Sequence, residues 1–91
     1  MNSALVKISQ MSDYFDNSVA QLSDDELFAS GYLRGHVDLA VGQLQLTEQA
    51  FSADDIMTAV DASLAVAIEN GELNHSDELL VQSIWQKIQA L

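Results

Sequence analysis

The sequence predicts an all-α protein, a single-domain four-helix bundle with up-down-up-down topology over residues 1–91. Breaks at residues 21–23, 47–52 and 70–74 divide the chain into four stretches of helical length. Apolar residues recur at helical spacing within these stretches, whereas no stretch shows the sustained period-two alternation of a strand. Short connections favour antiparallel neighbours, which gives the alternating direction of the helices.

The first stretch, residues 3–21, has the pattern of an ordinary amphipathic helix. Its polar residues Asp13 and Asp16 fall mostly off the apolar side. The apolar side consists of Leu5, Ile8, Met11, Phe15, Val19 and Leu22. We expect this side to face the other helices.

The second stretch, residues 24–46, is the most informative part of the chain. It begins with Ser23, Asp24, Asp25 and Glu26, the pattern of a capping box. One apolar arc then comprises Leu33, Val37, Ala40, Val41 and Leu44, and a second comprises Phe28, Tyr32, Leu39 and Leu46. A helix that is apolar on almost every side belongs in the interior. We therefore expect the second helix to be the most buried, with both arcs shielded by the other three.

The third and fourth stretches have clearer single stripes. The third begins at Ser52, and Gly71 stands where a left-handed cap would end it. Its stripe consists of Ile56, Val60, Leu64, Ala67 and Ile68. The fourth begins near Asn74 or Ser76. Its stripe consists of Leu80, Ile84, Ile88 and Leu91, flanked by Val81 and Trp85.

The charge balance is strongly acidic, with three basic residues against fourteen acids and a net charge of −11. Binding to phosphate backbones or anionic lipid needs clustered Lys and Arg, so we expect neither nucleic acid nor a membrane as partner. An acidic surface keeps a small protein soluble and can steer it toward a basic partner. The chain has no Cys, which excludes disulfides and thiolate sites. No signal peptide or membrane-spanning run is visible, and a cytoplasmic location is expected.

Three glycines, Gly31, Gly35 and Gly42, form a narrow stripe beside the second arc of the second helix. Each interior glycine costs up to about 1 kcal/mol relative to alanine. The favoured interpretation is close packing of another helix, with the alanines of the third stretch as its partner surface. There are two alternative explanations for the stripe. It receives a ligand or partner, or the helix breaks near Ser30. Close packing predicts that Gly35→Leu loosens or unfolds the domain.

The string from Tyr32 to Asp38 carries the candidate polar residues of an interaction surface. Arg34 is placed to pair with Asp38 four residues later, or to anchor a carboxylate or phosphate. His36 points to a different side, and no Ser or Asp is spaced to form a relay with it, so no catalytic residue is predicted. Trp85, at the edge of its stripe, is a candidate hot spot for association or dimerisation through the last helix.

Two acidic clusters are candidate metal sites. One begins the second helix, and the other lies around His75. Neither has the alternating acids, central glycine and distal glutamate of a calcium loop. Two His residues on different helices are weak support for zinc, and acids suit the positive end of any helix. No metal and no cofactor is therefore predicted.

Two segments resemble the YfcL family, a group of small proteobacterial proteins of unknown function. The segments are SDDELFASGYLRGHVDLAV and AIENGELNHSDELLVQSIW. The resemblance implies a small, helical, cytosolic bacterial protein, and it brings no established activity, cofactor or catalytic residue. It places Tyr32, Arg34, Gly35 and His36 within the family's recognisable string, which packing or binding would explain equally well.

The leading functional interpretation is an acidic protein-binding or adaptor module without catalytic activity, either a monomer or a homodimer. Its partner is an unknown protein, contacted through Tyr32, Arg34 and His36 or through the end near Trp85. The alternative is a protein that binds a small ligand or metal in a pocket between helices. A third interpretation, an enzyme, requires Arg34, His36 and an acid to share one pocket.

Overall fold

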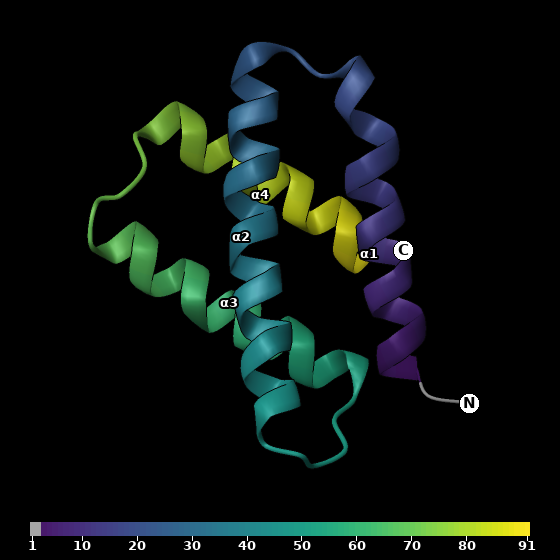
Figure 1. Ribbon diagram of the computed structural model, residues 1–91. Coiled ribbons are helices and arrows are strands. Elements are labelled where there is room, and N and C mark those ends of the chain that lie inside the picture. Colours follow the sequence, from purple (N-terminus) through teal and green to yellow (C-terminus); the bar gives the residue numbers. More distant parts are fainter. Residues whose placement is uncertain (1–2) are drawn as a thin grey trace.

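The computed structural model describes residues 3–91, which form four α-helices (Figure 1). Helix α1 spans Ser3–Ser18 and continues into a single 3₁₀ turn, η1, at Val19–Gln21. Helix α2 spans Asp24–Leu46, α3 spans Ala53–Glu69 and α4 spans His75–Gln89. The predicted all-α class and the predicted number of helices are confirmed, and the connections lie at the predicted breaks.

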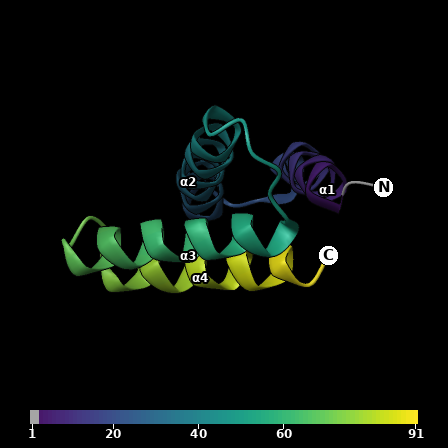
Figure 2. The same cartoon turned by 90° about the horizontal axis from the view of Figure 1, so that it is seen from below.

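The helices are arranged as two hairpins in two layers. Helices α1 and α2 run in opposite directions in one layer, and α3 and α4 run in opposite directions in the other (Figure 1). Seen from below, the α3–α4 layer runs across the α1–α2 layer, with both of its helices on the same side of α2 (Figure 2). Helix α2 packs against α1, α3 and α4, so the bundle is built around one face of α2.

Local side-chain caps set the starts of three helices. The Ser23 hydroxyl accepts a hydrogen bond from the Glu26 amide at 3.3 Å, and the Glu26 carboxylate accepts one from the Ser23 amide at 3.1 Å. This capping box confirms the predicted one, and its hydrogen bonds lower the pKa of Glu26. Ser52 and Asp55 form a second capping box, and Asn74 caps α4. Of the seven acids in the first turns of these helices, two, Glu26 and Asp55, take part in the capping boxes.

Gly71 ends α3 in the left-handed conformation, with a φ of +73°. Its amide donates to the Ile68 carbonyl at 3.0 Å, and the Glu72 amide donates to the Ala67 carbonyl at 3.1 Å. These two bonds define a Schellman motif, in which a side chain at the left-handed position would be strained. The predicted cap is confirmed, and it turns the chain toward α4.

The core lies between the two layers. Its largest fully buried side chains are Trp85, Met11, Leu33, Ile56, Ile88, Val60 and Val81. Trp85 is 2% exposed, and its indole N–H donates to the Asp61 carboxylate at 2.6 Å. The prediction of Trp85 as a surface hot spot is therefore wrong. Val81, Trp85 and Ile88 follow one another at helical spacing on the side of α4 that packs into the core.

Lys7 is buried where the start of α1 meets the end of α4. Its ammonium donates to the carbonyl oxygens of Ile88 at 2.8 Å, and of Gln89 and Leu91 at 3.3 Å each. Burial lowers the pKa of this ammonium. A cation placed on the last carbonyls of a helix satisfies orphan acceptors and complements the helix dipole. Lys7 therefore connects the beginning of α1 to the end of α4.

Helix α2 is buried on one side only. Its first arc supplies Leu33, Val37 and Ala40 to the core. Phe28, Leu39 and Leu46 of the second arc are 51%, 56% and 82% exposed. The prediction that both arcs are shielded is wrong, because α3 and α4 both lie on the same side of α2 (Figure 2).

The glycines of α2 do not receive another helix. A Cβ atom added at Gly31, Gly35 or Gly42 would meet no atom within 4 Å. The predicted close helix packing at these three residues is therefore wrong, and the expectation that Gly35→Leu unfolds the domain loses its basis. Helix α2 is also continuous through Ser30, so the glycines do not mark a break. They lie on the side of α2 that faces away from α3 and α4.

Candidate interaction face on helix α2

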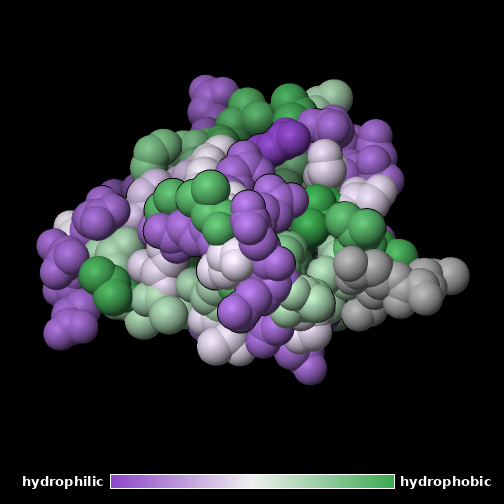
Figure 3. Space-filling model, turned by 60° about the horizontal axis from the view of Figure 1, so that its bottom comes forward, coloured by the Kyte–Doolittle hydropathy of each residue, from purple (hydrophilic) through white to green (hydrophobic). Residues whose placement is uncertain are grey.

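The outer face of α2, defined by Phe28, Gly31, Gly35, Leu39 and Leu46, carries three of the ten large apolar side chains that are exposed in residues 3–91. At a helical advance of about 100° per residue, its three large side chains fall within about 20° of one line along the helix. Leu46 closes the row at the connection to α3. Figure 3 views this end of the molecule and shows apolar side chains at the surface among hydrophilic ones.

A row of three rings runs along one edge of this face. The Phe28 and Tyr32 ring centroids lie 6.1 Å apart, and those of Tyr32 and His36 lie 4.8 Å apart. Residues four apart on a helix are neighbours on its surface, so Phe28, Tyr32 and His36 form a continuous row. The row follows directly from the sequence spacing.

Residues from outside α2 hold two of these rings in place. The Tyr32 hydroxyl donates to the Glu72 carboxylate at 2.8 Å, and the His36 Nδ1 atom is hydrogen-bonded to the Ser63 hydroxyl. Burial and the neighbouring carboxylate raise the pKa of Tyr32 to about 12, so the phenol stays neutral and remains a donor. Side chains that are ordered before binding lose less conformational entropy when a partner docks.

A hollow of about 230 Å³ lies between these rings and the apolar row. Its walls are Tyr32, His36 and Leu39, and Gly35 lies among them without a side chain. Because a Cβ at Gly35 would meet nothing within 4 Å, the space above this residue is open. The hollow therefore combines apolar walls with two polar side chains, Tyr32 and His36, whose hydrogen bonds are already made within the protein.

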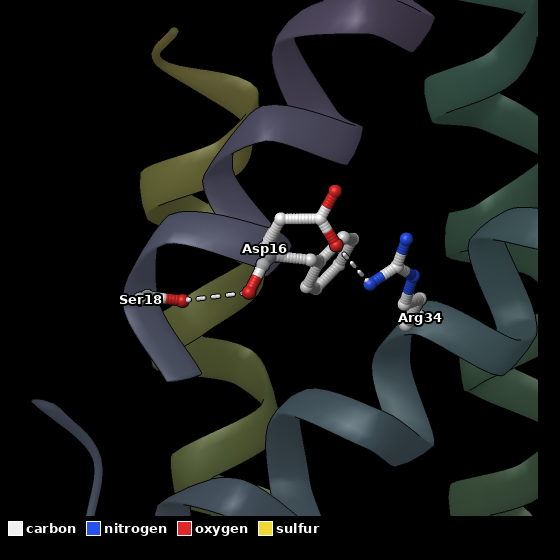
Figure 4. A network of polar contacts seen from close by, with 4 residues as sticks. Asp16, Ser18 and Arg34 are labelled. Atoms are coloured by element: carbon white, nitrogen blue, oxygen red, sulfur yellow. Dashed lines mark hydrogen bonds and ion pairs between the residues drawn. The ribbon is translucent and has the colours of Figure 1, made fainter. Parts of the chain in front are cut away.

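Arg34 lies on a different side of α2, toward α1. Its guanidinium donates to the Asp16 carboxylate at 2.8 Å and lies 5.6 Å from the centre of the Phe15 ring (Figure 4). The acid that pairs with Arg34 is thus Asp16 of α1 rather than Asp38 of α2. This ion pair links the two helices of the first hairpin.

A second recess, a groove of about 290 Å³, separates α1 and α2 beside this ion pair. Its lining comprises Ile8, Met11, Ser12, Phe15, Arg34, Val37, Asp38, Val41, Gly42 and Gln45. Arg34 and His36 line different recesses and do not form one site. The particular pocket named for the third interpretation, one shared by Arg34 and His36, is therefore not formed.

The structure thus brings together only part of the predicted surface. Tyr32 and His36 lie side by side, Arg34 faces α1, and Trp85 lies in the core. Within residues 3–91, no group of three or more His, Cys, Asp or Glu side chains is placed to hold a metal ion. None of the helices described is long and apolar enough to cross a membrane.

The fold and this face define a small all-helical protein whose central helix carries an exposed apolar row. The sequence matches the YfcL protein family over residues 7–90. It is 47% identical over 73 residues to the Escherichia coli (strain K12) protein described as "Uncharacterized protein YfcL", an alignment that covers 80% of this chain and 78% of that relative. The chain belongs to the YfcL family, as its two characteristic segments predict. No solved structure matches it.

Proposed function

We propose that the protein is a non-catalytic binding module that recognises another protein through the outer face of α2. The observation that carries this proposal is the alignment of Phe28, Leu39 and Leu46, all more than half exposed, on one side of the helix that also supplies the core. Single exposed apolar residues are ordinary, whereas apolar side chains gathered on one face are typical of interaction sites.

The ordered rings add to this argument. Aromatic residues are enriched among those that dominate the free energy of protein association. The contacts of Tyr32 with Glu72 and of His36 with Ser63 hold such rings beside a ready-made hollow. The separation of Arg34 from His36 also favours binding over catalysis. A cytoplasmic location, expected from the sequence, is part of the proposal.

Site-specific photo-crosslinking in living bacteria tests this function. A photoreactive benzoylphenylalanine placed at Leu39 should give an adduct of discrete mass. The matched control is Leu79 of α4, which is 58% exposed against 56% for Leu39 but lies outside the outer face. The proposal predicts the adduct at Leu39 and its absence at Leu79. The same products at both positions, or none at Leu39, would contradict it.

A second candidate function, binding of a small apolar ligand, is favoured by the groove between α1 and α2. Its volume of about 290 Å³ is close to the lower end of the range of about 300–1,000 Å³ for ligand pockets. Arg34 and Asp38 both line the groove, and the Arg34 guanidinium is already paired with Asp16. The apolar part of the lining, which includes Ile8, Met11 and Val41, therefore suits an uncharged apolar ligand.

Thermal shifts against a panel of metabolites and metals test the second candidate. A ligand of the folded state raises the melting temperature in a concentration-dependent way. Gly42 lines the groove, and a Cβ there would meet nothing within 4 Å, so Gly42→Phe should fill the groove and abolish the shift. Gly35→Leu, on the outer face, is the matched control and should leave the shift unchanged.

A further inference from the structure

Three acidic residues flank the outer face of α2, and the basic residues lie on other sides of the molecule. By helical position, Asp25 and Asp38 lie on opposite sides of the row of Phe28, Leu39 and Leu46. Glu72 lies at the Tyr32 hydroxyl, at the edge of the hollow.

All three basic residues of the chain are located away from this face. Lys7 is bound to the last carbonyls of α4, Arg34 is paired with Asp16 toward α1, and Lys87 lies in the last turn of α4. Arg34 lines the groove between α1 and α2 together with Asp38, but its guanidinium is paired with Asp16. The apolar row is therefore flanked by acids, and no basic residue lies on the outer face itself.

Building on the proposed function, we infer that the partner presents a basic amphipathic helix, and that one of its large apolar side chains occupies the hollow beside Gly35. An amphipathic helix lays its apolar side along a complementary row and anchors itself through side chains one turn apart. The bare backbone at Gly35 allows the partner close to α2, and Tyr32, His36 and Leu39 surround the inserted side chain. Lysine or arginine beside its apolar stripe would face Asp25 and Asp38.

Charge selects this occupant over a second copy of the chain. Each copy carries a net charge of −11, so two outer faces brought together would place acids against acids. Like charges across an interface suppress association, whereas opposite charges steer a partner to it and fix its register. A basic helix supplies the complement that another copy lacks.

The inference is tested with three synthetic amphipathic peptides of about 20 residues, which span about 30 Å as helices. All three share one leucine-rich apolar face, and their flanking positions are Lys, Gln or Glu. Binding of the labelled peptides is followed by fluorescence anisotropy. We expect the Lys peptide to bind most tightly and the Glu peptide most weakly. The affinity of the Lys peptide should fall with added salt, which screens exposed charges over about 8 Å at physiological ionic strength.

Variants locate the binding site. Gly35→Leu fills the hollow and should fold, because a Cβ there meets nothing within 4 Å. It should weaken binding of the Lys peptide about tenfold or more, as should Phe28→Ser, which removes the aromatic side chain at one end of the row. Leu79→Ser, an equally exposed position outside the face, is the matched control and should leave the affinity unchanged. Circular dichroism and thermal melting are used to check that each variant is folded.

The possible results separate this inference from the proposed function. If all three peptides bind equally and Gly35→Leu abolishes this binding, the outer face is a docking site but the partner need not be basic. If the Lys peptide binds and no variant weakens its binding, the attraction is unspecific and electrostatic. This result would overturn the role of the hollow. Self-association in sedimentation equilibrium that Gly35→Leu removes would identify a second copy as the occupant. Crosslinking at Leu39 without peptide binding would overturn only the helical partner, and failure of both would overturn both proposals.

Discussion

At the scale of single residues, Lys7 and Tyr32 show how a long side chain or a ring ties together segments that are far apart in the sequence. Lys7 reaches the final carbonyls of α4, and Tyr32 reaches Glu72 after the Schellman turn. The Lys7 ammonium finds its partners in a buried site, as buried polar groups generally must, whereas the Tyr32 hydroxyl meets Glu72 at the surface. Replacing one partner of either contact should therefore change a measurable property, the free energy of unfolding for Lys7 and the pKa for Tyr32.

Lys7→Met should destabilise the protein by about 2 kcal/mol, because the carbonyls of Ile88, Gln89 and Leu91 lose a charged donor. The Ile88 carbonyl keeps only its backbone donor, the Leu91 amide. Because methionine keeps most of the apolar stem of lysine, the loss of stability measures the contribution of the hydrogen bonds rather than that of packing. Urea denaturation followed by circular dichroism measures this change in the free energy of unfolding. Lys87→Met replaces an exposed lysine in the last turn of α4 and should cost less than about 0.5 kcal/mol. Equal losses in the two variants would show that Lys7 acts only through its charge.

The Tyr32 phenol should titrate at a pH of about 12 in the folded protein. Glu72→Gln removes the neighbouring negative charge and should lower the pKa of Tyr32 toward the ordinary value. Because the pKa is higher in the folded than in the unfolded chain, this group's stabilising contribution is complete below pH 10 and is lost as the pH rises from about 10 to about 12. Carbon-13 NMR of labelled tyrosine measures both pKa values. Glu69→Gln is the control, and a Tyr32 pKa unaffected by Glu72→Gln would contradict the observed contact.

At the scale of the elements, the ends of the helices could be predicted from the sequence, but the side of α2 that is buried could not. Capping boxes and the Gly71 turn depend on residues within one turn, so Ser23 and Ser52 mark their helix starts in the sequence itself. The side of α2 that is covered depends on where α3 and α4 lie, which no periodicity within α2 specifies. Phe28 and Leu39 have the spacing of core residues, and only the layer arrangement places them outside.

The same limit applies to the candidate site. The ring row of Tyr32 and His36 follows from four-residue spacing and could be predicted. The contact of Arg34 with Asp16, and the burial of Trp85, depend on how separate helices are packed together. Residues 18 positions apart in the chain meet only after the hairpin has formed.

Helix α2 should become more stable when its exposed glycine is replaced by alanine. Gly31→Ala should raise the free energy of unfolding by up to about 1 kcal/mol, since alanine is the better helix former and its Cβ meets no atom within 4 Å. Thermal and urea unfolding measure the gain. Ala29→Gly is the reverse control in the same turn and should destabilise the protein, because Ala29 is fully buried. A loss of stability in Gly31→Ala would restore the interpretation of close packing.

At the scale of the whole molecule, the two crossed hairpins make α2 both a core element and an exposed apolar surface. One side of α2 packs against the α3–α4 layer, and the opposite side is open over the length of the helix. Burial of one arc stabilises the fold, whereas exposure of the other leaves a row of apolar side chains in water. The two sides of one helix should therefore respond differently to substitution.

The double substitution Phe28→Ser and Leu39→Ser on the outer face should change the free energy of unfolding by less than about 1 kcal/mol, because both side chains are about half exposed. Leu33→Ala, on the buried side, should cost about 2–5 kcal/mol, since it removes a fully buried side chain from the core. Urea denaturation compares the two variants, and crosslinking or peptide binding should be lost only in the outer-face variant that remains folded. If that double variant were as unstable as Leu33→Ala, the outer face would belong to the fold, and its role in binding would have to be abandoned.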